Sequence, residues 1–181
     1  MMILIKRILL VFLRAFCTYD YRIYWERRSE FYSLNPKSLK ARWYSFYIYT
    51  VNKKENADIG LPPDHDIFAG CPQDNNHGLN GIVIAGGAKI GKNAFISHQV
   101  TIGRSRNGVP IIGDNVYIGP GAKIFGNIKI GNNVRIGANC PVFFDVPDNA
   151  TVVLPQPRVI IKESDYKYFV FAPSKLREED R

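Results

Sequence analysis

Histidines are the first candidates for acid–base chemistry in this chain of 181 residues, because imidazole titrates near neutral pH without special surroundings. There are three, at positions 65, 77 and 98. His77 lies within DNNHGLNGIVI, among Asn and Gly, which is unlike a core-packing context. His98 lies within ISHQVT, 21 residues further on. A general base and a solvated loop histidine are both open for His77, and a polar site residue and a plain surface residue are both open for His98.

Metal and nucleophile chemistry have weaker support in the sequence. The cysteines Cys17, Cys71 and Cys140 are widely spaced, with no CxxC pair, so we expect neither a disulfide framework nor a metal site. Cys140 falls at a small apolar position of the repeat described below, which favours inert packing. Cys71 is near His77 in sequence, so a Cys–His nucleophile is a minor alternative.

Six-residue repeats position these residues. The units are IAGGAK, IGKNAF and ISHQVT from Ile84, then IGDNVY, IGPGAK, IFGNIK, IGNNVR and IGANCP from Ile112. The first residue is always Ile, the fifth is always apolar and mostly small, and the second is usually Gly. A period of six predicts a coil of short parallel strands with three faces per turn, in which the first and fifth positions point inward and the coils stack. Gly at the second position would allow a tight turn or a close backbone approach.

The domain organisation follows from where the repeats begin and end. We predict a basic, aromatic, helical head over residues 1–56, a mainly β domain over 57–161 and a tail over 162–181. Within the head, helices are expected over 2–16 and about 20–50, the second interrupted near Asn35-Pro36. Within the β domain, 61–80 is expected to be an irregular arm and 104–111 an inserted loop leaving a corner of the coil.

The segment HGLNGIVIAGGAKIGKNAFISHQVTIG resembles hexapeptide-repeat acyltransferases, in particular the serine acetyltransferase subfamily, and within it the capsule and exopolysaccharide O-acetyltransferases. The resemblance covers roughly residues 57–161. It implies a left-handed parallel β-helix, a homotrimer, acetyl-CoA as co-substrate without a metal, and His77 as the catalytic base. It also implies an orienting aspartate in the arm, for which Asp64, Asp66 and Asp74 are candidates and Asp66 is favoured.

Two departures from serine acetyltransferases bear on the acceptor. Val109 stands where those enzymes have a second active-site histidine, just before the proline of the inserted loop. Asn76 replaces the acidic residue before the catalytic histidine, and we predict that Asn76 and His98 bind substrate. We also expect no counterpart of the large helical domain that precedes the coils in those enzymes, because the head here is short.

The resemblance further implies a groove between neighbouring prisms for the pantetheine arm of the co-substrate. Gly103, Pro120 and Ala138 would line it, and Arg158, in LPQPRVI, stands where the family has a GxPAR-like turn. Basic side chains that could meet the cofactor phosphates are Lys123, Lys129, Arg135, Arg158 and Lys162.

The main functional hypothesis is acetyl transfer to a hydroxyl of a sugar or polysaccharide precursor. Alternative acceptors are serine, a xenobiotic, or maltose or galactoside, and a third class is a non-catalytic β-helix scaffold. Zinc carbonic anhydrases share the fold, but the histidine spacings of 12 and 21 do not provide their three ligands.

The head carries the whole net charge of +8 and 13 of the 23 aromatic residues within its first 54 positions. We expect Tyr21, Tyr24, Trp25, Phe31, Trp43, Tyr44 and Tyr47 to cover the open end of the coil. The segment 3–16 has too short an apolar run to span a bilayer, so the expected location is cytoplasmic, with this segment lying on the inner face of the membrane. No motif supports nucleic-acid binding.

Overall fold

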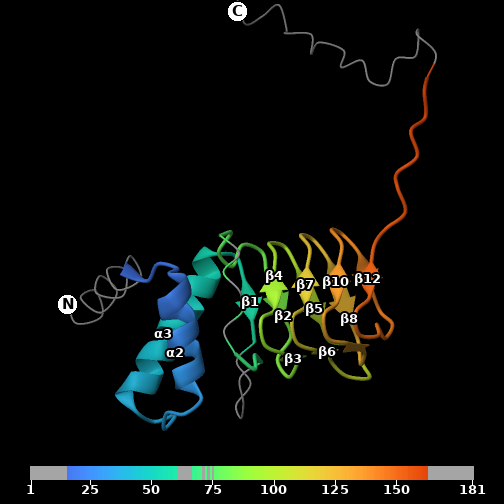
Figure 1. The fold of residues 1–181 in the computed structure, drawn as a ribbon. Coiled ribbons are helices and arrows are strands. Elements are labelled where there is room, and N and C mark those ends of the chain that lie inside the picture. Colours follow the sequence, from blue (N-terminus) through green and yellow to red (C-terminus); the bar gives the residue numbers. More distant parts are fainter. Residues whose placement is uncertain (1–15, 61–66, 71, 73, 75, 163–181) are drawn as a thin grey trace, which may run out of the picture.

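The computed structural model describes residues 16–60, 67–70, 72, 74 and 76–162, and these form a parallel β-helix capped at one end by two helices (Figure 1). The predicted helix over 2–16 falls almost entirely outside the described residues. Helices were also predicted over about 20–50 with a break near Asn35-Pro36. The two observed helices, α2 (Tyr21–Phe31) and α3 (Leu39–Lys54), flank that break.

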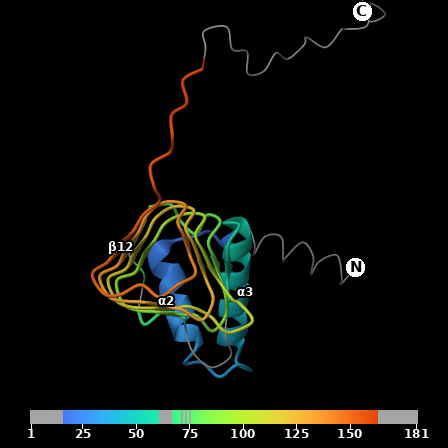
Figure 2. The same cartoon turned by 90° about the vertical axis from the view of Figure 1, so that its right-hand side faces the viewer.

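Three sheets make the three faces of the coil. Face A contains β1 (Asp58–Ile59), β2 (Val83–Ile84), β5 (Thr101–Gly103), β8 (Lys123–Phe125) and β11 (Pro141–Val142). Face B contains β3 (Lys89–Ile90), β6 (Ile111–Ile112) and β9 (Lys129–Ile130). Face C contains β4 (Phe95–Ile96), β7 (Tyr117–Ile118), β10 (Arg135–Ile136) and β12 (Thr151–Val152). Viewed from its end, the coil has a triangular outline (Figure 2).

Stacking places equivalent hexad positions over one another. Ile84, Ile102 and Ile124 occupy one register on face A, and the Ile residues that begin the eight hexads are at most 4% exposed. The fifth positions are also buried, from Ala88 to Cys140. The core is thus a column of aliphatic side chains, and truncating one such Ile to Ala costs about 2–5 kcal/mol.

The corners use two residue types for two reasons. Asn93, Asn115 and Asn133 adopt the left-handed backbone conformation at hexad position four, with φ between 55° and 57°. Their side-chain amides form a ladder from coil to coil, with N–O distances of 3.1 and 3.2 Å. Gly at position two instead lets the backbones of neighbouring coils approach closely, because a Cβ at Gly91 would come within 2.5 Å of the backbone of Gly113.

Strand stacking begins before the first hexad. β1 pairs with β2 through Asp58 and Val83, and Phe68 forms a parallel bridge with Ile90. The described part of the predicted irregular arm therefore adds a partial coil to the end of the prism.

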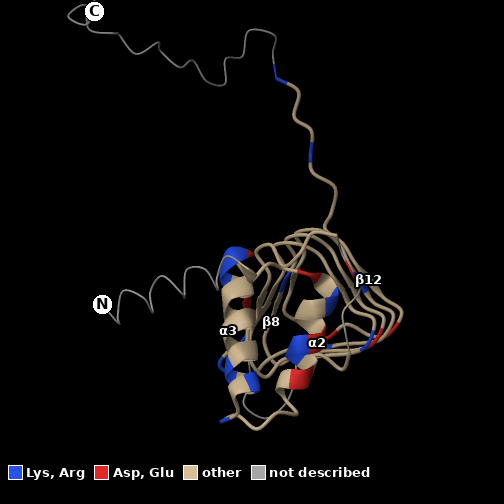
Figure 3. Ribbon diagram, turned by 90° about the vertical axis from the view of Figure 1, so that its left-hand side faces the viewer, with Lys and Arg blue, Asp and Glu red and all other residues tan. Residues whose placement is uncertain are grey.

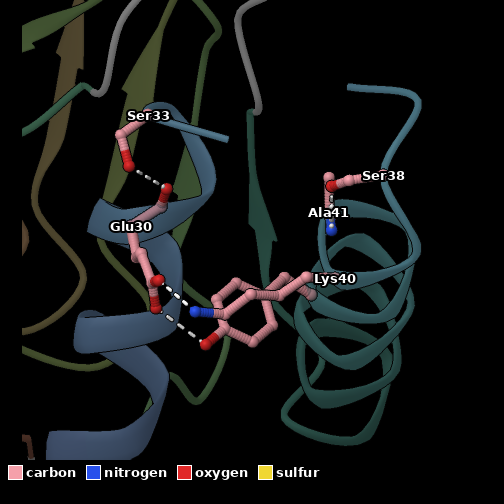
Figure 4. A network of polar contacts seen from close by, with 6 residues as sticks. Glu30, Ser33, Ser38, Lys40 and Ala41 are labelled. Carbon is pink, nitrogen blue, oxygen red and sulfur yellow. Dashed lines mark hydrogen bonds and ion pairs between the residues drawn. The ribbon is translucent and has the colours of Figure 1, made fainter. Parts of the chain in front are cut away.

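The helical cap lies across this end of the prism (Figure 3). Tyr24 and Trp25 are buried, and the Trp25 ring contacts Phe68 edge to face at 4.8 Å. Glu30 on α2 accepts hydrogen bonds from Lys40 and Tyr44 on α3, which joins the two helices (Figure 4) and lowers the pKa of Glu30, the Lys40 bond contributing most. The prediction that Trp43 covers the coil end is wrong, because Trp43 is 37% exposed; it lies at the border between the buried and the exposed side of α3, one turn before the buried Tyr47.

Candidate active site

His77 and His98 lie together at one corner of the coil. Their ring centroids are 5.3 Å apart and the ring planes are at 83°, an edge-to-face contact. His98 is half-buried at the corner between β4 and β5, whereas His77 is exposed on the turn that precedes β2. The structure therefore brings the two histidines together within one chain.

The turn that carries His77 stacks on the corner that carries His98. The backbone N–H of Gln99 donates to the carbonyl of Asn80 at 2.8 Å. A Cβ at Gly81 would lie 3.2 Å from Cγ of Gln99, so the two segments are in close contact. The His77 turn thus occupies the corner position of the partial coil, and this stacking places the two imidazoles on the same edge of the prism.

Glu55, which directly follows α3, contacts the His77 turn through both its backbone and its side chain. Its carbonyl accepts from the N–H of Gly81 at 3.2 Å. Its side chain lies against Gly78, where an added Cβ would be only 2.7 Å from Oε2. Gly78 has φ +63°, so neither the space nor the backbone conformation accommodates a larger residue there. Sequence analysis missed Glu55; its only signal is its place between α3 and β1.

Lys123 is fixed at the same corner from the following coil. Its Nζ donates to the carbonyl of Gln99 at 2.7 Å and to Oγ1 of Thr101 at 3.1 Å. An ammonium has three donors, and here one backbone oxygen and one side-chain oxygen hold the positive charge of Lys123 beside His98. The sequence grouped Lys123 with the phosphate-binding candidates, and the pairing of Thr101 with Lys123 is what assigns it to this corner.

Two of the three predicted groove residues stack under His98. Gly121 donates to the carbonyl of His98, and Asn139 donates to that of Pro120, which puts His98, Pro120 and Ala138 in one corner column. Pro120 is half-buried and Ala138 exposed, so a narrow strip of small side chains runs from the imidazoles along the prism. Gly103 is not in this strip; it ends β5 at the next corner, where the Phe125 ring covers it.

The basic candidates do not converge. Lys123 lies on face A, Lys129 on face B and Arg135 on face C, where its guanidinium stacks over Tyr117 at 5.1 Å. Arg158 and Lys162 lie in the exposed segment that leaves the prism after β12 (Figure 1). The structure therefore separates side chains that the sequence grouped as cofactor contacts.

The inserted loop lies at the opposite end of β5 from His98. Ser105 and Gly108 close it with a short antiparallel bridge, and Arg104 donates to the carbonyl of Gly86 at 2.7 Å. Val109 is half-buried against the core cluster. Within one chain, the loop and the histidine corner are thus a face apart.

Of the candidate orienting aspartates, only Asp74 lies among the described residues, and its Oδ1 accepts from the N–H of Asn76 at 3.0 Å. This bond fixes the backbone of Asn76, the residue before His77, which adopts the left-handed conformation with φ 55°. Asp64, Asp66 and Cys71 lie outside the described residues. Among the residues that the structure describes, no three His, Cys, Asp or Glu side chains gather as metal ligands.

Burial raises the pKa of two phenols in the helical cap. Desolvation raises the pKa of Tyr19, whose ring lies beside Gly78, and also raises the pKa of Tyr47, whose hydroxyl donates to the carbonyl of Thr18 at 3.1 Å. The phenols of Tyr19 and Tyr47 therefore stay protonated over the neutral range, and the Tyr19 ring lies next to the His77 turn at Gly78. Within the described residues, no helix is both long and apolar enough to cross a bilayer.

Known proteins resemble this arrangement in sequence and fold. Residues 110–140 match the model of the family described as "Bacterial transferase hexapeptide (six repeats)". The chain is 32% identical over 148 residues to a serine acetyltransferase of Buchnera aphidicola, covering 73% of this chain and 53% of the relative. It is 48% identical over 83 residues to a serine acetyltransferase of Staphylococcus aureus, covering 43% and 38%.

Among solved structures, serine acetyltransferase isoform 3 from Entamoeba histolytica, in complex with cysteine, superposes with a TM-score of 0.55 at 26% identity, covering 79% of this chain and 61% of that one. These relatives do not support the closer resemblance to capsule and exopolysaccharide enzymes that the sequence suggested. The chain spans about half the length of the first of these relatives. It is a hexapeptide-repeat β-helix protein, similar to serine acetyltransferases in both sequence and fold.

Proposed function

We propose that this chain is an acetyl-CoA-dependent O-acetyltransferase whose general base is His77 and whose first candidate acceptor is the hydroxyl of serine. The observation that carries the proposal is the imidazole pair at the head of the Pro120–Ala138 strip, 5.3 Å between ring centroids. The similarity to serine acetyltransferases supports both the reaction type and the acceptor.

The residues of the corner fit the roles such a transfer requires. Acetyl-CoA would supply the acetyl group as a thioester, with Pro120 and Ala138 offering a narrow strip along which its pantetheine arm could lie. His77 would take the proton of the acceptor hydroxyl as the oxygen attacks the thioester carbon, and would give it to the thiolate that leaves when the C–S bond breaks. General-base assistance of this kind contributes about 10²–10⁴-fold to a rate. Placement of the two substrates at one corner contributes further.

His98 and Asn76 are the proposed acceptor contacts. The two imidazoles meet edge to face, so one can hold the acceptor hydroxyl while the other removes its proton. Asn76 is exposed beside His77, with its backbone fixed by Asp74. Asp66 remains the candidate to orient His77.

The corner is open on the outside, and a second copy would complete it. Gly103 and the inserted loop lie across face A from the histidines, so one chain cannot enclose its own site with them. We therefore include a homotrimer in the proposal, in which the loop of one subunit faces the histidine corner of the next. Sedimentation velocity of the full chain tests the trimer, and a monomer at catalytic concentrations would contradict it.

A sugar hydroxyl is the second candidate acceptor. The specific observation that favours it is Val109, a half-buried apolar side chain where the resemblance implies a second histidine. A site without that histidine has one fewer polar contact for a small amino acid.

The deciding experiment measures thiol release from acetyl-CoA in the presence of L-serine, and then of a panel of free sugars. Wild-type protein is compared with His77→Gln. Release that depends on L-serine and on His77 supports the main proposal, whereas release only with a sugar selects the second acceptor. Absence of acceptor-dependent release with every compound would overturn the proposed function.

A further inference from the structure

The side of α3 that faces away from the coil forms an apolar and basic surface with no counterpart in the proposed reaction. Its residues recur at helical spacing: Leu39, Arg42, Trp43, Phe46, Tyr49 and Lys53. Leu39 is 81% exposed and Tyr49 is 55% exposed, whereas Tyr47 and Ile48, on the inner side, are buried. We call these six residues the outer face of α3.

Aromatic groups on this face are preorganised. The rings of Trp43 and Phe46 stack with centroids 5.7 Å apart, so their flat surfaces are held in a fixed arrangement. Beside them, a surface hollow lies between α3 and the end of α2, with Phe31, Arg42 and Tyr49 among its lining. Rigid aromatic rings next to a basic side chain suit a boundary that is apolar on one side and charged on the other.

The charge of α3 is entirely positive. The helix contains Lys40, Arg42, Lys53 and Lys54 and no acidic residue. Glu30 on α2 pairs with Lys40, which leaves Arg42 and Lys53 as exposed cations on the outer face. Lys53 lies 5.8 Å over the Tyr49 ring, so a cation and an aromatic ring are presented together.

The position of α3 leaves the outer face accessible. α3 lies across the end of the prism with basic segments toward both of its ends (Figure 3). Near the C-terminal end of α3, Tyr49 and Lys53 also line a surface hollow that they share with Asp58 and Val83 of the prism.

We propose that the outer face of α3 docks on an anionic phospholipid surface. Trp43 and Tyr49 would enter the headgroup region, with Arg42 and Lys53 against lipid phosphates. A second copy of the chain fits this face less well, because a two-fold contact would bring its basic residues against their own equivalents. The surface is separate from the segment 3–16 considered in the sequence, and it does not depend on the acetyltransferase proposal.

Co-sedimentation of the full chain with vesicles tests the docking. The vesicles are phosphatidylcholine alone, or phosphatidylcholine with phosphatidylglycerol. We expect binding only to the anionic vesicles, and roughly 30-fold weaker binding for R42Q/K53Q, from the attraction of two basic side chains to an anionic surface. W43S/Y49S should also bind more weakly. The matched control is F143S/F144S, which removes exposed aromatic rings near the other end of the prism.

A second measurement needs no variant. Trp25 is buried, so a blue shift of tryptophan fluorescence on adding anionic vesicles reports on the exposed Trp43. Wild-type binding by both double variants, or absence of the blue shift, would overturn the proposal. So would equal binding to neutral vesicles, or concentration-dependent self-association in solution that W43S/Y49S abolishes, because that outcome assigns the face to a second copy.

Discussion

His98 meets His77 edge to face, 5.3 Å between centroids, although one belongs to a regular hexad and the other to a turn before the hexads begin. The contact exists because the turn of His77 occupies the corner of a partial coil and stacks through Asn80 and Gln99.

Replacing His77 with Gln should lower acceptor-dependent thiol release by about 10²–10⁴-fold, because the amide retains polarity but cannot accept a proton. The melting temperature should not change, since His77 is exposed. The steady-state rate at saturating acetyl-CoA measures the effect, with His65→Gln as the matched histidine control. A rate within twofold of wild type would remove His77 from the chemistry.

Replacing His98 with Gln should act mainly on acceptor binding. Loss of one neutral hydrogen bond costs about 1 kcal/mol, so we expect the KM for the acceptor to rise about fivefold with a smaller change in kcat. The KM for acetyl-CoA should stay constant, which serves as the internal control. An unchanged acceptor KM would show that His98 is only a surface neighbour of His77.

Replacing Glu55 tests whether the cap positions the catalytic turn. Glu55→Gln keeps the side-chain volume against Gly78, whereas Glu55→Ala removes it. We expect Glu55→Ala to lower kcat about tenfold through misplacement of His77, and Glu55→Gln to retain most of it. Selective ¹³C-histidine labelling and NMR should show a displaced His77 signal in Glu55→Ala alone. Equal kcat in both variants and wild type would contradict a positioning role.

Stability should fall at alkaline pH because of the buried phenols. The pKa of Tyr19 and of Tyr47 is raised by burial in the folded state, so both phenols ionise more readily in the unfolded chain. Their contribution is complete below about pH 10 and is lost as the pH rises above it. Urea unfolding at pH 8 and at pH 10.5 should show the decrease.

The variant Tyr47→Phe separates this effect from general alkaline damage. It should lose about 1 kcal/mol at pH 8, through the lost bond to Thr18, but decline less steeply with pH than the wild type. Tyr49→Phe, on the exposed side of α3, is the control and should follow the wild-type curve. Parallel curves for all three proteins would exclude the phenols as the cause.

The sequence alone determined the coil, because the six-residue period sets which side chains point inward. An Ile at position one and a small residue at position five leave one way to bury both, and the structure has every one of these Ile residues in the core. The column of His98, Pro120 and Ala138 follows in part from the same period, since equivalent positions recur at each corner.

Only the tertiary structure decided which separate segments share a corner. The inserted loop changes the number of residues between stacked strands. Lys89 pairs with Ile111, which is 22 residues later, whereas Ile111 pairs with Lys129, which is 18 residues later. The turn of His77 has no repeat to fix its register, and Glu55 belongs to the helical head. Their meeting depends on hydrogen bonds between distant segments, which a local pattern does not encode. By contrast, the period itself places Lys123, Lys129 and Arg135 on three different faces, because they are one hexad apart and each hexad occupies one face.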